Sequence, residues 1–180
     1  RWQDKQMAIT RPTKGVRPSA FCLDDSCKIK VLDVGGSKEF RTVWKSHFHT
    51  SHCVCFLLDI SSTEKRYRES LEVLRETSNH FYLQGKPFLV LCTSLNGENG
   101  ISQRNVEQVR QECLATKKSP MQWFELSSGR EKEPLHWLVN TTLSQFEAIE
   151  IKRKSDGDIV QAERERKNDE REKKAISSSL

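Results

Sequence analysis

The sequence predicts an α/β fold with a mostly parallel, twisted sheet and flanking helices, and three observations lead to this prediction. Two apolar runs, residues 53–59 and 86–92, have the continuous hydrophobic character of strands covered on both faces. A segment with helical periodicity lies between them, and a strand, helix and strand of these lengths form a right-handed parallel crossover. A further strand-like run ends at Asp33-Val34-Gly35-Gly36, where an acid is followed by a glycine turn.

Composition limits the classes of function. The 180 residues allow one domain plus an extension, and the net charge of +5 is spread along the chain without a basic block, which argues against nucleic acid as a partner. No apolar run approaches the roughly 20 residues of a membrane span. Three of the six cysteines, Cys53, Cys55 and Cys92, lie in apolar strand-like runs, where we expect buried, reduced thiols, as in an intracellular protein.

The N-terminal third predicts a hairpin followed by a helix. Residues 16–23 and 27–32 are strand-like, and the turn-rich cluster 24–26 joins them. In residues 36–48 the helical spacing places four side chains on one face, which either a core or a partner surface explains: Phe40, Val43, Trp44 and Phe48. Zinc ligation is not predicted, because the spacing of the candidate ligands fits none of the usual paired-ligand patterns: His47, His49, His52, Cys53 and Cys55.

The remainder predicts helices, a last strand and a charged tail. A helix capped by Ser61, Ser62 or Thr63 should bury a stripe formed by Tyr67, Leu71, Leu74 and His80. A polar helix within residues 102–116 and a strand over 121–126 follow, and then a closing helix that should pack on the sheet through Leu135, Trp137, Leu138, Thr141, Leu143 and Phe146. Residues 147–180 are rich in mixed charge, with too few apolar positions for a confident coiled coil, and predict a solvated helix or a disordered extension.

The Asp33–Gly36 segment is a candidate phosphate and metal corner, because an aspartate can hold a Mg²⁺ water and glycine lets backbone N–H groups approach a phosphate. An ordinary strand-turn-helix contains the same motif about as often. The flanking sequence strengthens the assignment: Pro12-Thr13-Lys14-Gly15 precedes the corner, and Arg41, Trp44 and Phe48 follow it at fixed spacing. From about residue 9 to about residue 143, the chain resembles the Arf-like branch of the small GTP-binding proteins.

This resemblance implies a domain over residues 9–146, a remnant over 1–8 and a charged extension over 147–180. The remnant is too short for the family's first strand, Gly-rich phosphate loop and first helix, so we expect either an N-terminally incomplete fragment or a degenerate protein.

The cofactors that the resemblance implies are GTP or GDP with Mg²⁺, or none in this chain. The implied nucleotide site consists of Thr13 and Asp33 (both toward Mg²⁺), Gly35, Gly36, Asn96, Ser127 and Ser128. For Thr13, local capping of a turn is an equal alternative. The implied partner surface consists of Phe40, Arg41, Trp44 and Phe48.

Two departures from the family pattern predict weak activity. Ser37 stands where many small GTPases have the glutamine that orients the attacking water, so we expect little or no hydrolysis. Asn96 replaces the aspartate that accepts two N–H bonds from guanine, and its NH₂ group would face a donor. Losing one charge-assisted bond and stranding its donor should lower guanine affinity by roughly a hundredfold or more.

The charged tail extends the resemblance to the ciliary, Joubert-syndrome-linked Arf-like subgroup. That likeness implies an intracellular location at the cilium or a cytoplasmic membrane face. The implied partner is another Arf-like GTPase or an effector, with membrane contact only through an N-terminal segment that this chain lacks. Two hypotheses follow. One is a weakly binding, non-hydrolysing interaction module, in effect a pseudoGTPase; the other is an active switch or exchange-promoting factor when the missing N-terminus is present.

Overall fold

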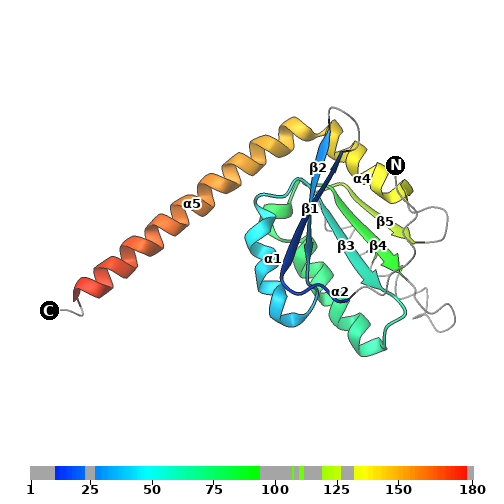
Figure 1. The fold of residues 1–180 in the computed structure, drawn as a ribbon, viewed down its shortest axis with the longest axis horizontal. Coiled ribbons are helices and arrows are strands. Elements are labelled where there is room, and N and C mark those ends of the chain that lie inside the picture. Colours follow the sequence, from blue (N-terminus) through cyan, green and yellow to red (C-terminus); the bar gives the residue numbers. More distant parts are fainter. Residues whose placement is uncertain are drawn as a thin grey trace. The chain divides into compact units, whose positions relative to one another are not determined.

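The structure is a computed structural model that describes residues 11–22, 27–93, 107, 110–111, 119–126 and 132–177 (Figure 1). The chain divides into two compact units, Arg1–Phe48 and His49–Leu180. The net charge is unevenly divided between them, which corrects the expectation of an even spread. The first unit has ten Lys and Arg against five Asp and Glu, whereas the second has 20 of each.

The first unit is a hairpin followed by a short helix, as predicted. Strand β1 (Val16–Cys22) pairs antiparallel with β2 (Lys28–Val34), with Val16 opposite Val34 and Cys22 opposite Lys28. The turn at 24–26 lies outside the described residues. A 3₁₀ turn, η1 (Lys38–Phe40), leads into α1 (Arg41–Phe48), so the α-helix begins five residues later than the helical segment predicted over 36–48.

The second unit contains a parallel sheet with strand order β3-β4-β5, which confirms the predicted fold class (Figure 1). Its strands are β3 (Val54–Asp59), β4 (Phe88–Thr93) and β5 (Met121–Glu125). Helix α2 (Glu64–Ser78) and the turn η2 (Phe81–Leu83) connect β3 to β4, and α2 buries Tyr67, Leu71 and Leu74 as predicted. His80 is only half-buried. Of the predicted polar helix, residues 107, 110 and 111 are described, and they are helical.

Strand β3 is covered on one face only, which corrects the prediction of two covered faces. Phe56 and Leu58 are buried, whereas Leu57 is 68% exposed and Cys55 is exposed as well. The reason lies in the edge position of β3. On the Leu57 face the buried cluster is formed by Leu89, Leu91 and Leu138, so helix α4 (Lys132–Ser144) covers β4 rather than β3. Of the three cysteines expected to be buried, Cys92 is buried and Cys53 is half-buried.

The closing helix packs on the sheet through Leu138 and Trp137 as predicted, but two of the six predicted side chains are exposed. Its buried residues are Pro134, Leu138 and Thr142, each one turn apart. Leu143 is 49% exposed and Phe146 is 47% exposed, since Phe146 already begins the next helix and stacks on His52. Of the three residues predicted as caps of α2, Thr63 occupies the N-cap position, but its side chain makes no capping bond. The hydroxyls of Ser61 and Ser62 donate to Asp59 instead.

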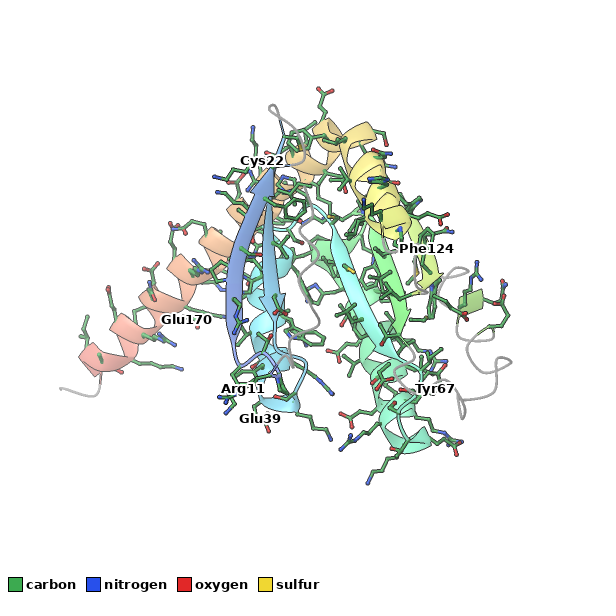
Figure 2. The ribbon with its side chains drawn as sticks, turned by 45° about the vertical axis from the view of Figure 1, so that its right-hand side comes forward. Arg11, Cys22, Glu39, Tyr67, Phe124 and Glu170 are labelled. Carbon is green, nitrogen blue, oxygen red and sulfur yellow. The ribbon has the colours of Figure 1, made fainter. Side chains whose placement is uncertain are left out.

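The charged tail forms one continuous helix, α5 (Phe146–Ser177). Every residue from 161 to 177 is exposed, and Glu170 in this half is labelled in Figure 2. A run of charged residues without an apolar seam is typical of a solvated helix, which was one of the two alternatives for this segment. Among the described residues, no helix is long and apolar enough to cross a membrane.

Candidate functional site

The corner predicted at the end of β2 has a defined geometry. The Gly35 N–H donates to the Gly15 carbonyl at 2.9 Å and so extends the hairpin ladder beyond the Val16–Val34 pair. This pairing brings the loop before β1 beside the end of β2. The Thr13 hydroxyl then donates to Asp33 Oδ2 at 2.7 Å, and this bond lies at the surface. The structure therefore joins two of the predicted site residues, 20 positions apart in the sequence.

The two glycines of the corner are glycine for different reasons. A Cβ atom on Gly35 would lie 2.5 Å from the Thr13 carbonyl oxygen and 3.0 Å from the Phe40 ring, so no side chain fits there. A Cβ atom on Gly36 would meet nothing within 4 Å. The protein's own packing thus requires Gly35, whereas the space at Gly36 is open.

Helix α1 braces the corner through two side chains that lie three residues apart. The Trp44 indole N–H donates to the Gly35 carbonyl at 2.9 Å, and Arg41 Nε donates to the Gly36 carbonyl at 3.2 Å. Of the predicted partner surface, Phe40, Arg41 and Trp44 are half-buried and Phe48 is buried. Their role toward a partner stays a prediction. Their bracing role was missed from the sequence, where only the fixed spacing from the two glycines hinted at it.

Ser37, the residue predicted to be unable to orient a water, makes a local contact. Its hydroxyl donates to Glu39 Oε2 at 2.5 Å. This bond, together with a backbone hydrogen bond and the charge of Arg41, lowers the pKa of Glu39. Figure 2 shows Glu39 and Arg11 at the corner end of the hairpin, opposite the end at Cys22. The single hydroxyl proton of Ser37 is therefore directed at Glu39.

The corner fits a magnesium-bound phosphate. A hydroxyl that donates its proton to a carboxylate keeps its lone pairs for a cation. Magnesium in nucleotide sites takes one or two carboxylates together with phosphate and water oxygens, and Asp33 with Thr13 supplies such a set. Asn96, Ser127 and Ser128 lie outside the described residues. In the described part of the chain, no three His, Cys, Asp or Glu side chains gather as metal ligands.

A parallel sheet with flanking helices and an Asp-Val-Gly-Gly corner define the class of the protein as a small GTPase fold. The solved structure of a small GTPase from Trypanosoma brucei, described as Arl6 BBS3 with bound nucleotide analogue GppNp, superposes with a TM-score of 0.63 at 22% identity. The match covers 78% of this chain and 86% of that one.

The sequence profile of the ADP-ribosylation factor family matches residues 1–142. The chain therefore belongs to this family, and the expectation of an Arf-like small GTPase is confirmed.

Two relatives share the name ADP-ribosylation factor-like protein 13B. The protein from Caenorhabditis elegans is 30% identical over 53% of this chain, and the one from Chlamydomonas reinhardtii is 26% identical over 86% of it. The chain matches only 25% and 30% of the length of these two proteins. A further relative is ADP-ribosylation factor-like protein 3 of Saccharomyces cerevisiae, 24% identical over 58% of this chain and 52% of that protein.

Proposed function

We propose that this chain is an Arf-family interaction module that binds guanine nucleotides weakly and does not hydrolyse GTP. The observation that supports this most directly is the contact between Ser37 and Glu39. Orienting an attacking water requires a donor and an acceptor at fixed positions, which an amide offers and a hydroxyl bonded to a carboxylate does not. Glu39 cannot replace it, because an ionised carboxylate only accepts hydrogen bonds.

Weak guanine binding follows from residues 93–96, Thr-Ser-Leu-Asn, which replace the family's Asn-Lys-x-Asp. The lysine that packs over the base and the carboxylate that accepts from it are both absent from this segment. An amide in place of the carboxylate sets donor against donor, which costs more than losing a bond. We infer that the loss is confined to base recognition and hydrolysis.

The intact corner supports a second candidate, an active switch or exchange-promoting factor in the full-length protein. In that role Thr13 and Asp33 would hold Mg²⁺, and Gly35, Gly36, Asn96, Ser127 and Ser128 would contact the nucleotide. The bound Mg²⁺ would neutralise phosphate charge. The observation that favours this candidate is the direct bond between Thr13 and Asp33.

Partner binding is proposed for the α1 region through Phe40, Arg41 and Trp44, whereas Phe48, also predicted for this surface, is buried in the core. The partner would be another Arf-like GTPase or an effector protein. An intracellular site at the cilium or a cytoplasmic membrane face is proposed from the likeness to the ciliary subgroup, in line with the two relatives named 13B.

Calorimetry with GTP and GDP on the full-length protein, with Mg²⁺ present, separates the two candidates. We expect dissociation constants weaker than micromolar for the natural protein. Asn96→Asp should tighten binding by about ten- to a hundredfold, because it restores the charge-assisted bond. Micromolar or tighter binding by the unmodified protein would overturn the first candidate and favour the second.

A further inference from the structure

Residues 49–53 connect α1 to β3 and so connect the two units of the chain; we call them the linker. One linker residue, His52, is held directly by the first third of α5. His52 Nε2 lies 2.5 Å from Glu150 Oε1, and the His52 ring stacks on Phe146 with centroids 5.5 Å apart and an interplanar angle of 11°. Arg153 holds the same carboxylate through two bonds of 2.6 and 3.0 Å.

The linker is also held through a buried charge cluster. Lys86 Nζ donates to the His49 carbonyl at 3.2 Å and lies 3.6 Å from Asp156 Oδ2. The side chains of Lys86 and Asp156 are only 1% and 3% exposed. Lys152 donates to Asp156 Oδ1 at 2.9 Å and lies over the Phe81 ring, 4.8 Å from its centroid. One aspartate of α5 is thus connected to the first linker residue through one lysine.

The docking of α5 depends on these charges more than on apolar packing. Among its described residues, only Ile149 and Asp156 are buried. A buried charge that loses its partner is strongly unfavourable, so this cluster permits one position and rotation of the helix and disfavours others. An apolar contact would tolerate sliding. Residues 161–177, beyond the docked part, are exposed throughout.

We propose that α5 is a coupling arm, in which the docking of residues 146–157 sets the conformational freedom of the linker and, through the Phe48–His49 peptide, of helix α1. Helix α1 braces the Gly35 and Gly36 carbonyls. Displacing α5 therefore loosens the corner. This device does not require a bound nucleotide, so it stands apart from the proposed function.

Hydrogen exchange measured by mass spectrometry on the full chain tests the proposal. Asp156→Asn keeps the size of the side chain and removes the charge that Lys86 and Lys152 share. We expect the amides of residues 41–53 to exchange about ten- to a hundredfold faster, as for the loss of charged hydrogen bonds, with less change in α2. Asp158→Asn, two residues along the same helix but exposed, is the matched control and should change neither segment.

Glu150→Gln, with exposed Glu147→Gln as its control, should give a smaller acceleration in the same residues. Equal acceleration in α2 and in residues 41–53, or no change in 41–53, would overturn the coupling. Should Asp156→Asn fail to fold, Lys152→Met decides the question, because it removes the partly exposed partner and leaves the Lys86–Asp156 pair in place. In the Lys152→Met variant, faster exchange confined to residues 41–53 supports the proposal. Exchange that is unchanged, or raised uniformly along the chain, contradicts the proposal.

Discussion

The corner at the end of β2 and the docked part of α5 use the same kinds of polar group in opposite ways. In the corner, Thr13 and Asp33 are bonded to each other at the surface, where a ligand can reach them. In α5, Asp156 and Lys86 are buried and serve the protein alone. The difference teaches that the exposed pair is available to the ligand proposed above, whereas the buried pair is available only to the protein's own packing.

The largest expected effect is a loss of stability when the buried Lys86–Asp156 pair is broken. Asp156→Ala strands the Lys86 charge in the interior and should destabilise the protein by about 3–5 kcal/mol. Asp158→Ala, at an exposed position on the same helix, should change stability by no more than about 0.5 kcal/mol. Urea unfolding followed by circular dichroism measures both. Equal effects of the two variants would contradict a special role for the buried aspartate.

The next effect concerns the steric demand in the corner. Gly35→Ala places a methyl group 2.5 Å from a backbone oxygen, which must move, and we expect a loss of about 1–3 kcal/mol. Gly36→Ala meets no atom within 4 Å and should cost far less. Thermal unfolding of the two variants provides the comparison. A Gly36 variant as unstable as the Gly35 variant would show that packing, and not a ligand, explains both glycines.

A smaller effect is expected from removing the hydrogen bond between Trp44 and the corner. Trp44→Phe keeps most of the aromatic contact but removes the N–H that bonds to the Gly35 carbonyl, at a cost of about 0.5–1.5 kcal/mol. The amides of residues 33–44 should exchange faster, and those of α2 should be unchanged. Unaltered exchange over 33–44 would mean that the indole bond does not hold the corner.

The smallest expected effect concerns Glu150 of α5 and how the stability of the fold depends on pH. Hydrogen bonds from Arg153 and His52 lower the pKa of Glu150 to about 2, from an ordinary value of 4.5. A carboxylate with a lowered pKa stabilises the fold above the pKa it has in the unfolded chain, and this contribution is lost as pH falls from about 4.5 to about 2. Glu150→Gln should therefore flatten the acid limb of the stability curve, while Glu147→Gln should leave it unchanged. An identical acid limb in both variants would contradict the shift.

The strands and the corner could be predicted from the sequence because their signals are local. Continuous apolar runs predicted β3 and β4, and the sequence Asp33-Val34-Gly35-Gly36 predicted the corner. The exposure of Leu57 could not be predicted, because it depends on which strand a distant helix covers. The Lys86–Asp156 pair was missed for a similar reason: 70 residues separate its members, and the only local hint was a lysine beside a buried strand. Thr13 was linked to Asp33 only through the family pattern.

Phosphate release from GTP by the full-length protein, in single turnover at saturating nucleotide and Mg²⁺, tests the central claim most directly. The claim is that the corner is retained while the chemistry is lost. We predict no release above the rate in buffer for the natural protein, and a measurable rate for Ser37→Gln, which supplies the missing amide. Release by the unmodified protein at the rate of its Ser37→Gln variant would contradict the account.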